Sequence, residues 1–436
     1  MSAARLNFSH GTHETHKEKM NLIKKVREDL NAPTAIILDI KGPKIRTHNF
    51  INDGVDLKEG QDFTFICGDE ILGDTEKCSI SYTDLYKDVK IGGEILVDDG
   101  LLRFIIEDVV GNKIKCKVTV GGTIKNHKGV NVPNVKINLP SITEKDKEDL
   151  IFGCENKVDF VAASFIRKAS DIEDVRNVLK THGGDYIQII AKIENQEGVD
   201  NIDSIIEAAD AIMVARGDMG VEIPIEKVPI IQKNIIRKCN EAGKIVITAT
   251  QMLDSMIRNS LPTRAEACDI CNAIFDGTDA IMLSGESASG NYPIEAAETM
   301  SRIAIETEDN LDYNYLNKRL KEPSLTSFSE AISYSACRSS NLLHAKAVVA
   351  ATNSGATAKL ISKYRPKCPI IAITPYDEVR RGLNLNFGIF PTKCDVFTTT
   401  DEILSEAKKV ATNLSIAEKG DDIIAVSYTH LRAHET

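Results

Sequence analysis

The sequence lacks the features of several protein classes. No run of eighteen apolar residues occurs among its 436 residues, which argues against a membrane-spanning helix. The beginning, MSAARLNFSH, does not have the layout of a signal peptide. The ten cysteines are scattered without the spacing of a disulfide framework, as free thiols are in a reducing compartment. We therefore expect a cytoplasmic protein that is not bound to a membrane.

An excess of positive charge is also missing. The net charge is -11, which argues against nucleic acid as a partner because a phosphate backbone requires a basic face. Any anion site must therefore be a local basic pocket in an acidic protein. The 42% hydrophobic and 27% charged composition is ordinary for a globular protein, and the length is too great for one hydrophobic core. Two or three domains are expected.

Two groups of metal-ligating residue types are more simply interpreted as structural. Cys268 and Cys271 have metal-like spacing, but no second Cys or His pair follows, so we favour packing on one helix face over zinc. His10, His13 and His16 are spaced for a helix face. That face is more often the start of a solvated helix than a metal site.

Apolar, β-branched runs alternate with helical patterns through much of the chain. Helical stretches between the runs end in Gly or small residues, as helix C-termini do. This alternation predicts an α/β fold with a parallel sheet. The predicted strands of this sheet are 34–40, 158–164, 186–193, 210–215, 244–250 and 279–284.

Two regions break this rhythm. Residues 47–141 contain short alternating runs with Gly or Asp-Gly turns, which predicts an inserted all-β domain. From residue 310 to 426 the chain predicts a separate open α/β domain that begins with a helix at about 326–342. Its predicted strands are 346–352, 369–374, 387–392 and 421–426.

Acidic side chains follow two neighbouring predicted strands. Lys192 and Glu194 lie two residues apart and so point the same way, and Asp218 follows the next strand. Two carboxylates at such strand ends suit Mg²⁺, and strand C-termini carry the chemistry of barrel folds. The alternative is that both acids are helix N-caps.

Two further strand ends carry polar groups. Arg167 and Lys168 follow one strand, and Thr248 and Thr250 lie at the end of another. Cations beside a Mg²⁺ site are what phosphoryl transfer requires, because they neutralise charge on the transferring oxygens. The alternative is a lysine that extends its ammonium into solvent.

Several long segments, read in order, resemble the pyruvate kinase family across about residues 2 to 426. They are ARLNFSHGTHE, LDIKGPKIRT, VDDG, KGVNVP, SFIRKAS, KIENQEG, VARGDMGVEIP, TATQMLDSM and PTRAEACDICNAIFDGTDAIMLSGESASGNYP. The resemblance implies a TIM-type (β/α)₈ barrel formed by 1–46 and 142–309, with the β-domain as a lid and the C-terminal domain as a regulatory unit.

The two ends depart from this pattern. The barrel segments are shorter than the ~250 residues typical of a whole barrel. We therefore expect the first β/α unit to be absent. The final residues, 427–436, have no apolar period, and we expect them to be unrelated to the fold.

The resemblance implies transfer of the phosphoryl group of phosphoenolpyruvate to ADP, giving pyruvate and ATP. By motif position, Glu194 and Asp218 would hold Mg²⁺ or Mn²⁺. Lys168 would neutralise the phosphoryl group during transfer, and Arg5 would contact it. The amides of Gly217 and Asp218 with the Thr250 hydroxyl would bind the substrate carboxylate. Thr250 and a nearby water are the candidate relay that protonates the enolate.

Other residues are assigned by the same resemblance. Asn7, His10, Arg46 and Lys128 resemble nucleotide-side residues. Asn7, Ser9, Asp39 and the carbonyl of Ile40 resemble a monovalent-cation site.

Family members with Lys at position 44 tend to work without K⁺, because the ammonium supplies the charge. We therefore expect Lys44 to replace K⁺ and K⁺ dependence to be weak or absent.

The stretch 351–366 resembles the family's regulatory phosphate loop. The residues that would form it are Thr352, Ser354, Gly355 and Thr357, which precede or begin a predicted helix. An ordinary capped helix is the alternative. The family also implies a homotetramer and a phosphorylated effector.

Two other functions remain open at this point. One is an inactive, truncated ligand-binding remnant of the same fold. The other is a different Mg²⁺-dependent barrel enzyme that performs carbon–carbon chemistry on pyruvate or phosphoenolpyruvate. The carbon–carbon enzyme leaves the β-lid without a role. ADP-dependent pyruvate formation would distinguish a kinase from such an enzyme.

Overall fold

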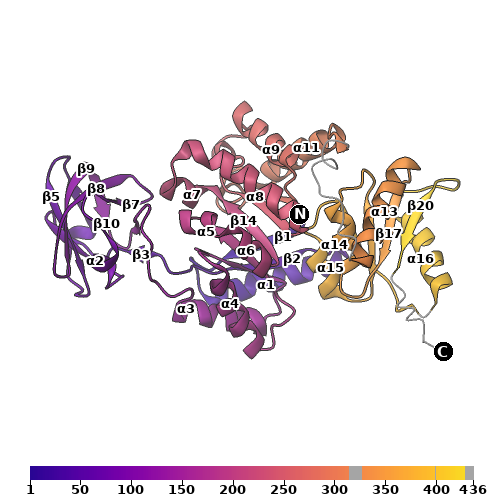
Figure 1. Ribbon diagram of the computed structural model, residues 1–436, viewed down its shortest axis with the longest axis horizontal. Coiled ribbons are helices and arrows are strands. Elements are labelled where there is room, and N and C mark those ends of the chain that lie inside the picture. Colours follow the sequence, from indigo (N-terminus) through magenta and orange to yellow (C-terminus); the bar gives the residue numbers. More distant parts are fainter. Residues whose placement is uncertain (314–326, 398, 428–436) are drawn as a thin grey trace.

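The computed structural model describes residues 1–313, 327–397 and 399–427. Figure 1 shows three bodies in a row along the longest axis, with the all-β lid at one end, the barrel domain in the middle and the C-terminal domain at the other end. The predicted tail, 427–436, lies outside the described residues apart from Ser427.

The barrel domain is built on a seven-stranded parallel sheet, which confirms the predicted fold class. The sheet order is β1-β2-β12-β13-β14-β15-β16, and in the described part of the chain the two end strands, β1 and β16, do not pair with each other. Each predicted run of this domain contains one strand, and β1 was not among the predicted runs. The bounds are β1 Ala3–Asn7, β2 Ala35–Asp39, β12 Phe160–Ala163, β13 Gln188–Ile193, β14 Ala211–Ala215, β15 Ile245–Ala249 and β16 Ala280–Met282.

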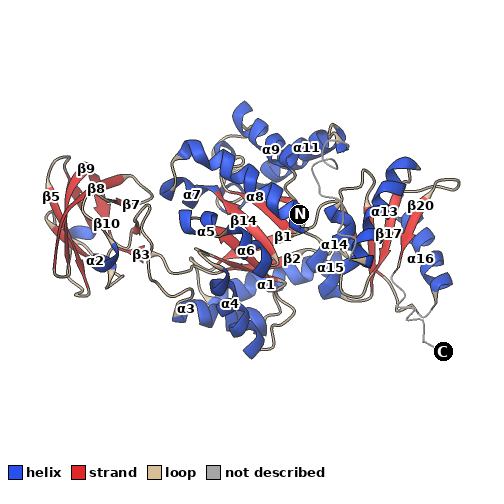
Figure 2. Ribbon diagram, viewed as in Figure 1, coloured by secondary structure: helices blue, strands red, loops and turns tan. Residues whose placement is uncertain are grey.

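Helices cover the outer face of this sheet (Figure 2). Several begin at a threonine whose side chain accepts a bond from the first turn, as Thr12, Thr143 and Thr263 do. The helices are α1 His13–Asp29, α3 Glu144–Glu155, α4 Ala169–Thr181, α5 Gln196–Asp200, α6 Ile202–Ala208, α7 Arg216–Glu222, α8 Val228–Ala242, α9 Arg264–Asp276, α10 Gly285–Ala288 and α11 Pro293–Asp309, with short 3₁₀ turns at Ile225–Lys227 and Asp254–Ile257.

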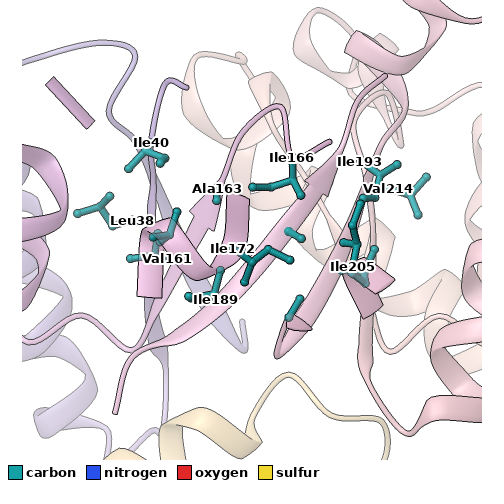
Figure 3. Close-up of a cluster of buried hydrophobic side chains, with 14 of the residues drawn as sticks. Leu38, Ile40, Val161, Ala163, Ile166, Ile172, Ile189, Ile193, Ile205 and Val214 are labelled. Carbon is teal, nitrogen blue, oxygen red and sulfur yellow. The ribbon is translucent and has the colours of Figure 1, made fainter. Parts of the chain in front are cut away.

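Alternate strand residues bury two different cores. Leu38, Val161 and Ile189 pack outward against helices, as Figure 3 shows for part of this cluster. Ile37 and Ile190 belong to a separate inner cluster, in which alanines alternate with larger side chains such as Phe160. Because successive strand residues face opposite ways, both cores come from the same continuous apolar runs.

The lid is the predicted insertion. Its main sheet has the order β3-β11-β7-β8-β9-β5-β6 and includes Ile45 and Arg46, so it begins two residues before the predicted 47. The lid also contains the four-residue helix α2 Leu85–Asp88 and a 3₁₀ turn, Ile51–Asp53. Its strands are β3 Ile45–Arg46, β4 Gly54–Leu57, β5 Asp62–Cys67, β6 Lys77–Ile80, β7 Glu94–Val97, β8 Leu102–Val110, β9 Lys113–Val120, β10 Gly122–Lys125 and β11 Gly129–Asn131.

The C-terminal domain is the predicted open α/β unit, with a parallel sheet in the order β19-β18-β17-β20. The predicted start of its first helix, at residue 326, lies outside the described residues. Its elements are α13 Phe328–Leu342, β17 Ala347–Ala351, α14 Ala356–Lys363, β18 Ile370–Thr374, α15 Asp377–Leu383, β19 Ile389–Lys393, α16 Thr400–Asn413 and β20 Ile423–Val426.

This domain docks against the end of the barrel sheet where the strands begin. Arg381 Nε lies 2.6 Å from Asp159 Oδ1, and Arg365 Nη2 lies 2.9 Å from Asp279 Oδ1. Both aspartates directly precede a strand. The C-terminal ends of the strands lie on the opposite side and face the lid. The C-terminal domain therefore leaves that end of the sheet available for a functional site. Among the described helices, none is long and apolar enough to cross a membrane.

Candidate active site

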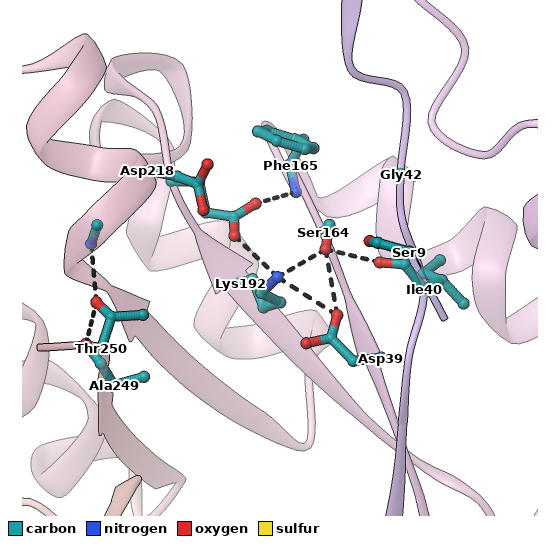
Figure 4. Close-up of polar contacts among 12 residues, drawn as sticks. Ser9, Asp39, Ile40, Gly42, Ser164, Phe165, Lys192, Asp218, Ala249 and Thr250 are labelled. Atoms are coloured by element: carbon teal, nitrogen blue, oxygen red, sulfur yellow. Dashed lines mark hydrogen bonds and ion pairs between the residues drawn. The ribbon is translucent and has the colours of Figure 1, made fainter. Parts of the chain in front are cut away.

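Four polar residues continue the inward-facing rows of the sheet at the strand C-termini. Asp39 follows Ile37, Ser164 follows Ala162, and Lys192 follows Ile190, each by two residues. Glu194 comes two residues after Lys192. A period of two therefore brings these side chains together at the C-terminal end of the barrel strands, where Figure 4 labels Asp39, Ser164 and Lys192.

Lys192 is the centre of this group. Its Nζ lies 2.7 Å from Ser164 Oγ, 3.3 Å from Asp39 Oδ1 and 2.9 Å from Glu194 Oε1. Burial opposes the charged form, but the carboxylates of Asp39 and Glu194 outweigh it and raise the pKa of Lys192 well above its usual range. The side chain, 10% exposed, is a fixed cation.

Glu194 and Asp218 are the expected metal ligands, and the structure brings them together. Glu194 Oε2 accepts a hydrogen bond of 2.7 Å from the Phe165 amide. Burial is the main cause that raises the pKa of Glu194, and the Asp218 carboxylate adds to the increase, although Lys192 opposes it. Within the described residues, no cluster of three or more His, Cys, Asp or Glu forms a metal site.

These two carboxylates fit Mg²⁺. Glu194 Oε1 is buried and has no hydrogen-bond donor in proper geometry in the described part of the chain, although the Lys192 ammonium is close. Mg²⁺ is commonly held by one or two carboxylates, with waters and substrate phosphate completing its shell. The donor set therefore suits this ion without a third protein carboxylate.

Lys168 is not part of this group. It is exposed at the N-cap of α4, and its amide lies 3.2 Å from Asp171 Oδ2. The alternation of strand β12 ends before it, because Phe165 adopts a positive φ of 57° and redirects the chain. The prediction that Lys168 neutralises the phosphoryl group does not match this position, and Lys192 is the ammonium at the carboxylate cluster.

Thr250 lies beside the Asp218 turn. Its hydroxyl accepts a bond of 2.8 Å from the Gly217 amide and donates one of 2.6 Å to the Ala249 carbonyl. The Gly217 amide, which we predicted for the substrate carboxylate, is therefore already used by Thr250. The Asp218 amide belongs to the first turn of α7, at the same strand end.

The residues predicted for a monovalent cation are brought close to Lys192. Asp39 accepts bonds from Arg5 Nε and Lys192 Nζ on its two oxygens. Ser164 Oγ donates to the Ile40 carbonyl at 2.7 Å, and Figure 4 shows Ser9 beside Ile40. Asn7 Oδ1 accepts the Ser9 amide at 3.0 Å. Two protein cations thus already flank Asp39.

Lys44 connects the barrel to the lid. Its Nζ lies 3.2 Å from Asp218 Oδ1 and 3.4 Å from Asp99 Oδ1 of the lid. Burial lowers the pKa of Lys44, but these two carboxylates outweigh burial and raise it. Lys44 contacts the expected metal ligand rather than Asp39. A cavity of about 460 Å³ opens next to it between lid and barrel, with Phe165 and Glu222 in its lining.

The residues predicted for the nucleotide fall into two groups. Arg46 and Lys128 lie side by side in the lid, where Arg46 Nη1 donates to the His127 carbonyl at 2.9 Å and Lys128 Nζ lies 2.9 Å from Asp98. Asn7 and His10 belong to the barrel, at and after the end of β1. The structure does not bring these two groups into contact in the described residues.

The expected regulatory loop precedes α14. Gly355 has a positive φ of 85°, and its amide donates to Thr352 Oγ1 at 2.9 Å. Ser354 is exposed and Thr357 is buried in the first turn. The Thr352 bond closes the turn before α14, whose N-cap is Gly355 without a side-chain cap bond in the described residues, and Ser354 presents one exposed hydroxyl at the helix N-terminus.

The two groups considered for metal have other contacts. His13 Nε2 lies 2.6 Å from Asp149, and His16 Nε2 lies 2.7 Å from the His10 carbonyl. Cys268 and Cys271 lie on α9 as predicted, but Cys268 is exposed, so the expectation that both pack in the core is wrong.

The fold and the site together define a lidded α/β-barrel protein with a cation and two carboxylates at its strand C-termini. A family model for the pyruvate kinase barrel domain matches residues 1–297, and one for the pyruvate kinase alpha/beta domain matches residues 330–436. The chain belongs to the pyruvate kinase family.

Individual relatives agree with this assignment. The chain is 67% identical to a pyruvate kinase of Clostridium perfringens over 98% of this chain and 90% of that protein. It is 51% identical to a pyruvate kinase of Geobacillus stearothermophilus over 97% of this chain and 72% of that protein. The crystal structure of a pyruvate kinase from Cryptosporidium parvum has a TM-score of 0.95 and 41% identity, covering 98% of this chain and 89% of that one.

Proposed function

We propose that this chain transfers the phosphoryl group of phosphoenolpyruvate to ADP and so forms pyruvate and ATP. The observation that carries the proposal is the Lys192 ammonium, held 2.9 Å from Glu194 at the strand ends of a pyruvate kinase fold. Phosphoryl transfer depends on positioned positive charge, because the transferring group spreads its charge over three oxygens. The site provides such charge beside two carboxylates.

Lys192 takes the role that motif position gave to Lys168. Two unit charges 4 Å apart interact by about 1 kcal/mol in water and by about 4 kcal/mol at an effective dielectric constant of 20. Lys192 is buried and fixed on three sides, whereas Lys168 is exposed. Its ammonium therefore interacts more strongly with a phosphoryl group bound at the carboxylate cluster. Arg5, beside Asp39, is the second cation for the phosphate.

Glu194 and Asp218 would hold Mg²⁺ or Mn²⁺, which supplies positive charge to the substrate oxygens when bound. Lys44, 3.2 Å from Asp218, holds that carboxylate toward the lid. The lid carries Arg46 and Lys128, which we assign to the nucleotide with Asn7 and His10. Closing the lid then excludes water from the transfer.

Thr250 is the candidate for proton delivery to the enolate, through a water. Its hydroxyl and the Asp218 amide would also hold the substrate carboxylate. Since the Gly217 amide donates to the Thr250 hydroxyl, that hydroxyl is held at the strand end where the substrate carboxylate would bind.

We also propose that Lys44 makes the reaction nearly independent of K⁺. Adding K⁺ to an assay free of Na⁺ and K⁺ should change kcat by less than about threefold, or ~0.7 kcal/mol. Lys44→Glu should lower kcat in that buffer by at least about tenfold, and K⁺ should restore part of the loss, because a third carboxylate then faces Asp218 and Asp99.

Lys41→Glu makes the same charge change three residues away and serves as the control. We expect it to leave the response to K⁺ unchanged. A large increase in the rate of the unmodified chain on adding K⁺ would contradict the role of Lys44.

Thr352, Ser354, Gly355 and Thr357 are proposed as the site of a phosphorylated effector in a homotetramer. Fructose 1,6-bisphosphate should then raise the Tm of the chain, and Ser354→Asp should abolish the shift by like-charge repulsion. Ser415→Asp, which changes an exposed serine in the same domain, is the control. An equal Tm shift in all three proteins would place the ligand elsewhere. Light scattering on the same samples gives the oligomeric state.

The function is tested by pyruvate formation from phosphoenolpyruvate with and without ADP, together with a thermal melt of the same sample. We expect a cooperative melt and pyruvate formation that requires both ADP and Mg²⁺. A folded protein without turnover would indicate the ligand-binding remnant. Pyruvate consumption or formation independent of ADP would favour a carbon–carbon enzyme.

A further inference from the structure

Arg216, the residue before Gly217 and Asp218, makes an unusual number of contacts next to the site. Its Nη1 lies 2.7 and 2.6 Å from the two carboxylate oxygens of Asp269 on α9. Its Nη2 donates to the Thr250 carbonyl at 2.6 Å, and its Nε donates to the Ala249 carbonyl at 3.3 Å. The side chain is 12% exposed. The guanidinium therefore ties the end of β15 to the start of α7.

Thr250 adopts a backbone conformation that a β-branched residue avoids. Its φ is 70°, and Gln251 follows with a φ of 55°. Left-handed backbone at a threonine costs free energy and persists only where surrounding contacts hold it. Arg216 supplies such contacts, because it binds the carbonyls on both sides of the Thr250 amide nitrogen and Cα.

This conformation decides where the Thr250 hydroxyl points. In the left-handed state the hydroxyl meets the Gly217 amide at 2.8 Å, beside the Asp218 turn. A threonine with extended backbone at this position, directly after β15, would carry its side chain elsewhere, since side-chain direction follows φ and ψ. Asp269 in turn holds the guanidinium, because both of its carboxylate oxygens contact Nη1.

We propose that Arg216 and Asp269 are positioning residues that hold Thr250 in the left-handed conformation needed for its hydroxyl to act on the substrate. The proposal rests on the proposed function, in which Thr250 binds the substrate carboxylate and relays the proton. Arg216 makes no contact with Glu194 or Lys192 in the described part of the chain and therefore acts through Thr250.

A double-variant comparison tests this route. Arg216→Met should lower kcat by about 10- to 100-fold, because small misplacements of an acting group have effects of this size. Thr250→Ala should lower it similarly, and the double variant should be no slower than Thr250→Ala by more than about threefold. Losses that multiply in the double variant would show that Arg216 acts independently of Thr250 and would overturn the proposal.

Two further variants separate positioning from general destabilisation. Arg176→Met removes an arginine with a similar set of partners, the Asp210 carboxylate and the Ala208 carbonyl, away from the site. It should lower Tm without the loss in kcat. Asp269→Asn keeps the shape of the side chain and should give a smaller loss than Arg216→Met; an unchanged kcat would exclude Asp269 from the pair.

A crystal structure of Arg216→Met tests whether Arg216 holds the Thr250 conformation, and this test does not depend on measuring activity. We expect Thr250 to leave positive φ, or its hydroxyl to lose the Gly217 amide. Retention of both features would overturn the proposal even if kcat falls. Absence of turnover in the unmodified chain would instead reject the proposed function, and the Thr250 geometry would still report on Arg216.

Discussion

Replacing Lys192 with Met is expected to lower kcat by about 10²- to 10³-fold or more, the range found when one preorganised electrostatic group is removed from an active site. The ammonium is buried between Asp39 and Glu194 and is a fixed cation beside the expected metal carboxylates. Initial rates with saturating phosphoenolpyruvate, ADP and Mg²⁺ give the comparison.

Lys168→Met is the matched control, because it makes the same change at an exposed lysine near the same strand ends. Its kcat should stay within about threefold of the unmodified chain, as surface substitutions usually perturb little. Lys192→Arg keeps the positive charge and is the control for misfolding of the Lys192→Met variant. A large loss of kcat in Lys168→Met, with kcat retained in Lys192→Met, would reverse the roles assigned to these two lysines.

Glu194→Gln is expected to weaken Mn²⁺ binding by at least about tenfold, since even outer-shell partners of a metal are worth 10- to 100-fold. Turnover with Mg²⁺ should fall by about 10²-fold or more. The amide keeps an oxygen for the Phe165 amide but loses the charge that attracts the ion. Electron paramagnetic resonance of free Mn²⁺ measures the affinity independently of activity.

Glu197→Gln is the control for this change. Glu197 lies in α5, three residues after Glu194, and it pairs only loosely with Lys136, at 3.8 Å. Both Mn²⁺ affinity and kcat should remain close to those of the unmodified chain. Equal Mn²⁺ affinity in the two variants would exclude Glu194 as a ligand.

Much of the fold could be predicted because the strands of a barrel are buried on both faces. A short continuous apolar run such as 244–250, with a helical pattern on either side, is typical of a buried parallel strand. Lys192 and Glu194 could also be placed on one face, because both belong to the regular alternation of β13 or its end. This part of the site follows from a period of two.

The remaining parts depend on features that a linear pattern does not contain. Phe165 and Thr250 adopt positive φ, so alternation stops at Phe165 and does not give the position of Lys168 or the Thr250 hydroxyl. Lys44 meets Asp99 across 55 positions of sequence and Asp218 across 174. Only the folded lid brings those carboxylates to one ammonium.

Phosphoryl transfer from phosphoenolpyruvate to ADP is tested most directly by a phosphorus balance on the purified chain, measured by ³¹P NMR. With phosphoenolpyruvate, ADP and Mg²⁺, the phosphoenolpyruvate signal should decrease as the γ-phosphate signal of ATP rises in equal amount. Omitting ADP, or using Lys192→Met, should suppress both changes. Loss of phosphoenolpyruvate with release of inorganic phosphate and no ATP would contradict transfer of the phosphoryl group to ADP.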